Sequence, residues 1–294
     1  MTKTVAFAGR TLCDTACRLG EGPTYDPATD TAFWFDILER KLHELQLGTM
    51  RKQVHDMPVH GSALAVIDGQ RQLILADAGL FIRTVADGRL TPFAKLEDKP
   101  QNRSNDARVH PSGALWASTM GRSAQKHSGA IYHVAGARVT RLFSGITIPN
   151  SICFSPDGAT AYYTDTDVNR LMRVAIDAKT ALPQGQPECL SDRSGEPGGI
   201  DGSVCDADGL IWNARWGAGA VDVYRPDGTR IASHSIPAAQ TTCPAFIGAK
   251  ADRLLVTSAW DGLDAAARAD DPQAGRTFEL GLPVKGRFEP KFLP

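Results

Sequence analysis

The sequence predicts an all-β protein, a six-bladed β-propeller with four-stranded antiparallel blades. Three observations lead to this prediction. Hairpin turn signals recur roughly every 40 to 50 residues, two short apolar segments follow each turn, and helical periodicity is nearly absent. The turns begin at Asp26, Ile67, His110, Ser155, Asp206 and Gly248. A β-sandwich would have more closely spaced turns, and an α/β fold would need helices between its strands. We therefore expect residues 1–294 to form a single propeller domain.

The segments after the turns suit the inner strands of propeller blades. The first segment of each repeat is rich in β-branched, aromatic and aliphatic residues; in chain order these segments are TAFWFDI, RQLILAD, GALWAST, TAYYTDT, GLIWNAR and RLLVTSA. A second, amphipathic segment follows each of them: KLHELQL, GLFIRTV, GAIYHVA, RLMRVAI, AVDVYRP and GRTFELG. To close the ring, the N-terminal stretch TVAFAGRTL is expected to supply the outer strand of the last blade, which removes free sheet edges.

Composition excludes several classes of protein. The 294 residues are 42% hydrophobic and carry a formal net charge of −1, which allows one large core but offers no basic stripe for nucleic acid. No apolar run is long enough for a membrane span, and the N-terminus lacks the apolar core of a signal peptide. We expect a cytoplasmic protein, and nothing in the sequence indicates an obligate protein partner.

The six cysteines are scattered and are expected to be reduced thiols. Cys13 and Cys17 share one face if their segment is a strand, which leaves a metal or redox pair open. Because no second pair lies at zinc-site spacing, two packed thiols are the preferred interpretation.

Asp201 lies between glycines in the stretch GGIDG, shortly before the DADG turn. A carboxylate is costly to desolvate unless it is paired or bound to a metal, and the flanking glycines indicate backbone that makes room for something. The other repeats can be compared at the same offset from their turns, where the residues are Glu21, Ser62, Asn105, Asn150, Asp201 and Cys243. In a propeller this offset is the start of the innermost strand, where the blades converge. Four of the six side chains therefore direct oxygens toward one axis.

Two carboxylates and two amide oxygens predict a hard-oxygen metal site. Such a site suits one divalent cation, Ca²⁺ first, with Mg²⁺, Mn²⁺, Zn²⁺ and Fe²⁺ also compatible. The alternative is that these Asp and Asn residues only cap turns, as they commonly do. Four polar residues in register favour the metal site.

The motifs around these positions also resemble a known family, that of regucalcin (senescence marker protein 30), gluconolactonases and luciferin-regenerating enzymes. The matching stretches are LGEGPTYD, NRSNDARVHPSGALWASTMG, IPNSICFSPDGATAYYTDT, GGIDGSVCDADGLIWNARWG and the tail VTSAWDGL with AGRTFELGLPVKG. The resemblance implies a six-bladed propeller that hydrolyses sugar lactones with one divalent metal ion. It implies Glu21, Asn150 and Asp201 as metal ligands, with Asp201 also acting as the catalytic base. It implies that Arg103 binds the substrate and that Asn105, counted here with the substrate-binding residues, lies beside the metal or the substrate.

The sequence departs from that family in the segment after STMG, which reads RSAQKHSG and lacks an acidic residue that some members have there. The sugar preference of any one member is therefore not transferred, and the expected substrate is an aldono- or uronolactone. For Arg103 an alternative is a surface arginine paired with Asp106 or Glu97.

The expected activity is that of a metal-dependent sugar lactone lactonase, a carboxylic ester hydrolase. No G-x-S-x-G nucleophile motif or phosphate-binding loop competes with this interpretation. Two alternatives stay open: a non-enzymatic calcium-binding regulatory or scaffold propeller, and an organophosphate or aryl esterase that uses the same metal site.

Overall fold

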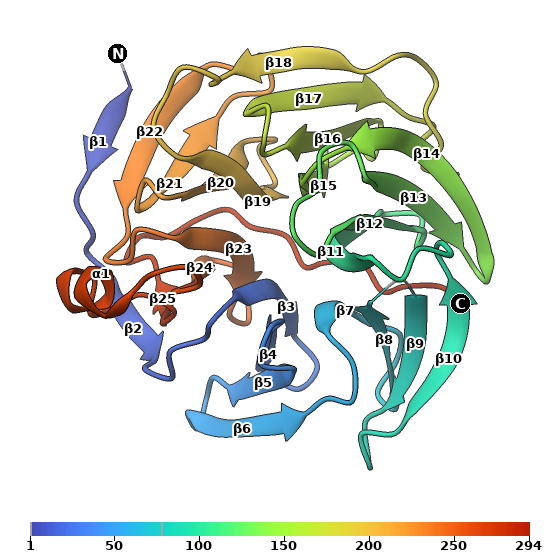
Figure 1. Ribbon diagram of the computed structural model, residues 1–294, viewed down its shortest axis with the longest axis horizontal. Coiled ribbons are helices and arrows are strands. Elements are labelled where there is room, and N and C mark those ends of the chain that lie inside the picture. Colours follow the sequence, from blue (N-terminus) through green and yellow to red (C-terminus); the bar gives the residue numbers. More distant parts are fainter. Residues whose placement is uncertain (1, 78) are drawn as a thin grey trace.

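The computed structural model, which describes residues 2–77 and 79–294, is a ring of six antiparallel blades (Figure 1). Blade 1 contains β3 (Gly20–Asp26), β4 (Thr31–Asp36), β5 (Lys41–Gln46) and β6 (Arg51–Asp56). Blade 2 contains β7 (Gly61–Val66), β8 (Arg71–Ala76), β9 (Gly79–Thr84) and β10 (Leu90–Lys95). Blade 3 contains β11 (Asn102–Val109), β12 (Leu115–Gly121), β13 (Gly129–Ala135) and β14 (Arg138–Ile146). Blade 4 contains β15 (Pro149–Phe154), β16 (Thr160–Asp165), β17 (Arg170–Ala175) and β18 (Glu188–Asp192). Blade 5 contains β19 (Gly199–Cys205), β20 (Ile211–Trp216), β21 (Ala220–Tyr224) and β22 (Arg230–Ser235). Blade 6 contains β23 (Thr241–Ile247), β24 (Arg253–Ser258), β25 (Thr277–Glu279) and β2 (Arg10–Cys13). The predicted fold class is confirmed.

Burial falls from the centre of the ring to its rim. Every residue of β15, an innermost strand, is buried, whereas the outermost strand β6 is almost entirely exposed. The two apolar segments predicted after each turn form the second and third strands of the blades, so neighbouring blades pack face to face through them. One short helix, α1 (Ala265–Asp270), has no buried residue and lies outside the ring of blades.

The two ends of the chain close the ring. β2 pairs antiparallel with β25 as the outermost strand of blade 6, with Arg10 opposite Glu279, which confirms the expected strand exchange for this part of the N-terminal stretch. The first part of that stretch behaves differently. β1 (Lys3–Val5) pairs parallel with β22 and adds a fifth strand to blade 5. These three residues cover backbone groups that the free edge of β22 would otherwise leave unpaired.

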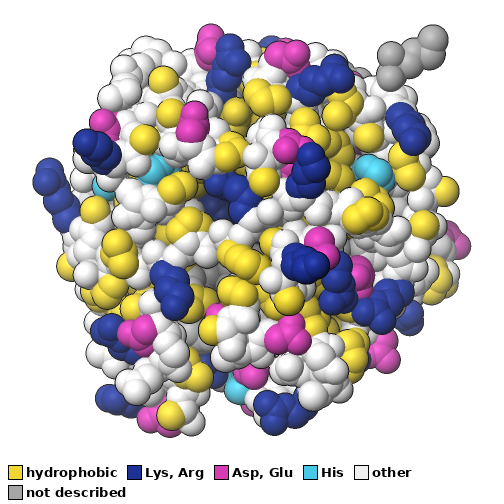
Figure 2. Space-filling model, turned by 180° about the vertical axis from the view of Figure 1, so that it is seen from behind, with side chains coloured by type: hydrophobic (Ala, Val, Ile, Leu, Met, Phe, Trp, Pro, Cys, Tyr) yellow, Lys and Arg dark blue, Asp and Glu magenta, His cyan; other side chains and the backbone are white. Residues whose placement is uncertain are grey.

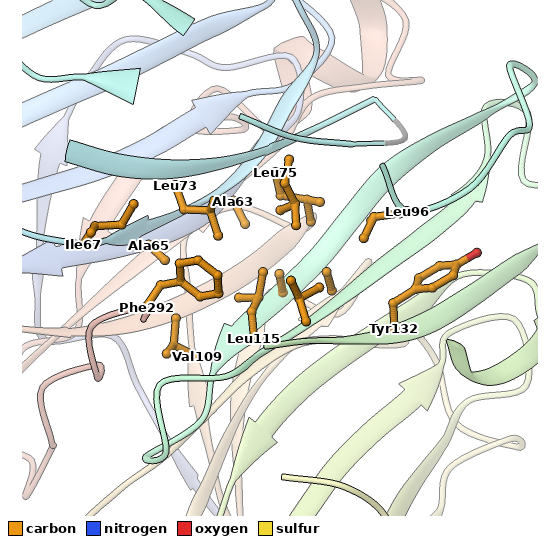
Figure 3. Packing of buried hydrophobic residues seen from close by; sticks show 14 of the residues in the cluster. Ala63, Ala65, Ile67, Leu73, Leu75, Leu96, Val109, Leu115, Tyr132 and Phe292 are labelled. Carbon is orange, nitrogen blue, oxygen red and sulfur yellow. The ribbon is translucent and has the colours of Figure 1, made fainter. Parts of the chain in front are cut away.

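The interfaces between blades are the hydrophobic cores. Between blades 2 and 3, leucine and alanine side chains of β7 and β8 meet Val109 and Leu115 of blade 3 (Figure 3). Phe292, almost at the end of the chain, inserts its ring into the same cluster and is fully buried there. Phe292, near the C-terminus, therefore belongs to the core.

The segment 283–294 reaches Phe292 by crossing the ring, and its path is visible as the red coil through the centre of Figure 1. Its backbone N–H groups donate hydrogen bonds to the carbonyls of Ala251 in blade 6, Val66 in blade 2 and Gly113 in blade 3. The Glu289 carboxylate accepts a hydrogen bond from Thr24 of blade 1 at 2.7 Å. These contacts lie at or near the turns between the first and second strands of the blades. The segment thus covers the end of the channel opposite to the starts of the innermost strands.

Candidate active site

A cavity of about 350 Å³ opens at the end of the ring where the innermost strands begin. The structure brings all five predicted site residues to its wall: Glu21, Arg103, Asn105, Asn150 and Asp201. The other lining residues are Leu19, Met120, Arg122, Ser123, Ala124, Ile148, Thr166, Trp216 and Asp261. Ser62 and Cys243, at the same repeat position, are not among the lining residues. Ser62 is buried and bonds Ser104, and Cys243 is buried beside Arg108.

A bulge in each innermost strand turns the site residues toward the channel. The pairing register of all six innermost strands shifts at this position, for example between Glu21 and Thr24 and between Asn150 and Cys153. β-bulges commonly re-aim side chains next to active sites. Gly22 and Ser151, which directly follow Glu21 and Asn150, have left-handed φ values of 55° and 59°.

The glycines that flank Asp201 make room for neighbouring side chains. A Cβ atom on Gly199 would lie 2.6 Å from the methyl group of Thr166, and one on Gly202 would lie 2.4 Å from the Cys243 sulfur. Both distances are too short for any side chain. The glycines of the GGIDG stretch therefore let blades 4 and 6 approach the strand that carries Asp201.

The carboxylates of Glu21 and Asp201 form the electrostatic centre of the cavity. Desolvation raises the pKa of Glu21, and the nearby Asp106 raises it further. Desolvation also raises the pKa of Asp201, and Glu21 adds to this effect. One carboxylate oxygen of Asp201, Oδ1, has no hydrogen-bond partner among the described residues. Two desolvated carboxylates that repel each other and lack a full set of donors are stabilised by a bound cation.

A directed chain of hydrogen bonds connects three blades across the cavity floor. Arg103 Nη1 donates to Asn105 Oδ1 at 2.8 Å, and Asn105 Nδ2 donates to Asn150 Oδ1 at 2.8 Å. Asn150 Nδ2 then donates to the Thr166 hydroxyl at 3.0 Å. The Thr166 hydroxyl donates to the Ile200 carbonyl at 2.7 Å, directly before Asp201. This series of hydrogen bonds fixes which end of each asparagine amide is the donor and which is the acceptor.

Arg103 is a buried cation of the site and not a surface residue. It makes no ion pair with Asp106 or Glu97, so the alternative considered for it is wrong: its guanidinium bonds the Ser104 carbonyl and Asn105 instead. Burial lowers the pKa of Arg103 to about 10, which leaves the side chain charged at neutral pH.

Sequence reasoning missed most of the wall that is formed by the ends of second strands; of these residues it placed only Arg122 near the rim. These strands run antiparallel to the innermost ones, so their last residues return to the same end of the ring. Arg122, Thr166, Trp216 and Asp261 reach the cavity in this way. Strand direction was the signal that could have identified them. Arg122 is held at the rim by an ion pair with Asp77 at 2.6 Å.

Asp106 was also overlooked as a component of the site. Strict alternation along β11 would put Asn105 and Asp106 on opposite faces, but the bulge in this strand interrupts the alternation. Asp106 accepts a hydrogen bond from the Ile152 backbone at 2.7 Å, and its charge raises the pKa of both Glu21 and Asp201.

The donor set of the cavity suits a hard cation. Within residues 2–77 and 79–294, no group of three or more His, Cys, Asp or Glu side chains is arranged to hold a metal ion. The candidate ligands here are two carboxylates and one amide oxygen, and oxygen donors of this kind are typical of Ca²⁺ and Mg²⁺ sites.

The cysteines are all free thiols, as expected, and only Cys189 is exposed. Cys13 and Cys17 pack in the core between blades 1 and 6, where the Cys17 sulfur lies 3.5 Å from His43 Nε2. Burial raises the pKa of Cys17 far above its usual range, which makes it a poor nucleophile and metal ligand.

Charged side chains of both signs are interspersed over the face shown in Figure 2, and this face shows no stripe of a single sign. Among the described residues, no helix has the length and apolar character needed to cross a membrane.

Comparison with known proteins gives consistent matches over the whole chain. The family model described as SMP-30/Gluconolactonase/LRE-like region matches residues 19–260. A protein of Rhizobium meliloti (strain 1021) named "Putative sugar lactone lactonase" is 68% identical over 99% of each chain. The pentonolactonase XacC of Haloferax volcanii is 34% identical over 95% of this chain and 96% of its own. The crystal structure of a calcium-binding protein, regucalcin, from Agrobacterium tumefaciens C58 superposes with a TM-score of 0.99 at 60% identity, covering 100% of both chains.

Proposed function

The chain belongs to the SMP-30/Gluconolactonase/LRE-like family, and we propose that it is a sugar lactone lactonase that uses one divalent metal ion, first of all Ca²⁺. The observation that supports this most directly is the convergence of Glu21, Asn150 and Asp201 on one cavity. The buried, unpartnered Oδ1 of Asp201 is the donor atom that such an ion needs. The names of the curated relatives support the activity, and the calcium-binding regucalcin supports the choice of ion.

Glu21 and Asp201 would hold the ion through carboxylate oxygens and Asn150 through Oδ1. Their combined charge of −2 balances a divalent cation. When bound, the ion polarises the lactone carbonyl and stabilises the negative charge that develops on its oxygen.

The side chains of the cavity carry out the proton transfers and position the substrate. Asp201 accepts a proton from a water molecule, whose oxygen bonds to the carbonyl carbon of the lactone. The bond between that carbon and the ring oxygen then breaks. The proton held by Asp201 passes to the ring oxygen, which leaves as a hydroxyl group of the open-chain sugar acid. One water is consumed, and Asp201 returns to its starting state.

The cavity wall suits a lactone with several hydroxyl groups. Arg103 offers a planar fork of donors, and its Nη1 already holds Asn105 in place. Nine of the fourteen lining residues are polar or charged, so an aliphatic lactone would leave these polar groups unsatisfied. We propose an aldonolactone or uronolactone as the substrate class.

The test is a panel of sugar lactones run on chelator-treated protein with Ca²⁺, Mn²⁺, Zn²⁺, Mg²⁺ or Fe²⁺ added back. We expect turnover only with added metal. Asp201→Asn keeps the shape of the side chain but removes one charge and the base, so kcat should fall by roughly 10²- to 10⁴-fold. Asp261→Asn is the matched control, because Asp261 lines the same cavity but pairs with Arg18. It should lose at most a few-fold.

Each alternative function has its own outcome in this panel. Tight Ca²⁺ binding without turnover of any lactone would indicate a non-enzymatic calcium-binding protein. Aryl esters or phosphotriesters hydrolysed as fast as lactones would indicate a general esterase. More than half of wild-type turnover in Asp201→Asn at saturating metal would contradict the assignment of Asp201.

A further inference from the structure

Two hydrogen bonds connect Thr166 to the proposed metal ligands or their neighbours, although Thr166 is not itself a proposed ligand. The residue follows β16 directly and lines the cavity. Its hydroxyl accepts a hydrogen bond from Asn150 Nδ2 at 3.0 Å and donates one to the Ile200 carbonyl at 2.7 Å. Its methyl group lies over Gly199, where a Cβ atom would come within 2.6 Å of it. Three contacts therefore fix both the position and the rotamer of this side chain.

The direction of these bonds determines the orientation of the Asn150 amide. A threonine hydroxyl carries one hydrogen, and here that hydrogen is used by the Ile200 carbonyl. The oxygen of Thr166 can then only accept, so it requires the NH₂ end of the Asn150 amide. A reversed amide would place two oxygens together at Thr166 and two NH₂ groups together at Asn105, because Asn105 Nδ2 is already the donor on the other side.

From this geometry we propose that Thr166 is a positioning residue for the metal site. It keeps Oδ1 of Asn150 available to the ion and ties Asn150 to the strand that carries Asp201. The inference rests on the proposed metal site and adds a residue to it. Partners that orient metal ligands typically contribute 10- to 100-fold to metal affinity.

A purely structural role is the competing explanation, because the bond to Ile200 also links blades 4 and 5. The two roles differ in what they change. A structural cross-link affects the stability of the protein, whereas a positioning residue affects the affinity for the cation in protein that is fully folded.

The experiment measures Ca²⁺ affinity by calorimetry on chelator-treated protein. Thr166→Val keeps the shape of the side chain and removes the hydroxyl, and we expect Ca²⁺ affinity to fall at least 10-fold. Thr166→Ser keeps the hydroxyl and should stay within about threefold of wild type. In activity assays at saturating Ca²⁺, Thr166→Val should reach most of the wild-type kcat, because its defect lies in binding the ion.

Thr164→Val is the matched control. Thr164 is fully buried in β16, the strand that ends just before Thr166, and its hydroxyl donates to the Arg170 carbonyl at 2.7 Å, outside the series of side-chain hydrogen bonds that reaches Asn150. This variant should lose thermal stability and keep wild-type Ca²⁺ affinity. Should Thr166→Val be unstable, Thr166→Ala carries the same expectation, because it removes the hydroxyl without adding an apolar methyl.

The outcomes separate this inference from the function on which it rests. If wild-type protein binds none of the divalent cations, the proposed metal site is wrong and the inference fails with it. If wild-type protein binds Ca²⁺ and the folded valine or alanine variant binds it equally well, only the role of Thr166 is refuted.

Discussion

The Ser151 hydroxyl donates a hydrogen bond to the main-chain carbonyl of Asp201 at 2.6 Å, so the residue after one proposed metal ligand is bonded directly to another. Ser151 has a left-handed φ of 59°, a conformation that costs less in glycine. Its fully buried hydroxyl also bonds Ser203 and Asn213. The bonds offset the backbone strain and fix the spacing between blades 4 and 5 at the site.

The metal-free protein should lose stability as the pH rises. Burial and Asp106 raise the pKa of Glu21 to about 8 in the folded state, above its ordinary value of 4.5. A raised carboxyl pKa means that the folded state binds the proton more tightly than the unfolded state. The stability contribution is therefore complete below about pH 4.5 and is lost as the pH approaches 8.

This pH dependence can be measured as the Tm in chelator between pH 5 and pH 8. Glu21→Gln cannot titrate and should show a smaller fall in Tm over this range than wild type. Saturating Ca²⁺ should reduce the fall in wild type. Equal slopes for wild type and Glu21→Gln in chelator would contradict the assignment.

Arg103→Ala should distinguish neutral from acidic substrates. If Arg103 pairs with a substrate carboxylate, the variant should lose more kcat/KM on an acidic sugar lactone than on a matched neutral one, by about 1.5 to 3 kcal/mol. Equal losses on both lactones would leave Arg103 as a donor to hydroxyl groups only. Arg122→Ala tests whether the second cation of the wall contributes.

Gly22→Ala should disturb the first proposed ligand. A Cβ atom at Gly22 would lie 2.0 Å from the Ser62 carbonyl oxygen, and the φ of 55° disfavours any side chain. We expect a loss of about 2 kcal/mol or more in the free energy of unfolding and weaker metal binding. Gly69→Ala is the control, because nothing lies within 4 Å of its added carbon; its stability should be nearly unchanged.

A thiol reagent should modify one cysteine in the native protein and six after denaturation. Cys189 is the exposed thiol, and the other five are buried. Because the proposed site contains no cysteine, activity should survive this modification and need no reductant. Rapid native reaction at Cys13 or Cys17, or loss of activity when both are replaced by serine in folded protein, would show a role for that pair.

Phe292→Ala should destabilise the protein by about 3 to 5 kcal/mol, because its ring is fully buried between blades 2 and 3. Leu293→Ala, at the next position, removes a side chain that is 61% exposed and should have little effect. Urea unfolding measures both. Similar midpoints for the two variants would mean that the C-terminal segment contributes little to the core.

The sequence allowed the ring and the part of its cavity formed by the innermost strands to be predicted, because both depend on a repeating pattern. The turn and two-strand pattern recurs six times, so one offset identified Glu21, Asn105, Asn150 and Asp201 together. The pairing of β1 with blade 5 depends on three residues without a pattern, of which two are exposed and one is half-buried. Asp106 and Thr166 reach the site through a bulge and through the return of a second strand, and a single repeat does not encode either.

The pairing of β2 with β25 determines when the proposed metal site can form during synthesis. β2 is synthesised long before its partner β25, so Leu12 and Cys13 cannot pack against Ile247 and Leu255 until that later part of the chain has been made. Blade 6 lies between the blade that carries Asp201 and the blade that carries Glu21. The two carboxylates are therefore brought to their final separation only after β25 has been synthesised. Cation binding then requires a chain that includes β25, and translation products that stop before Thr277 should not show it.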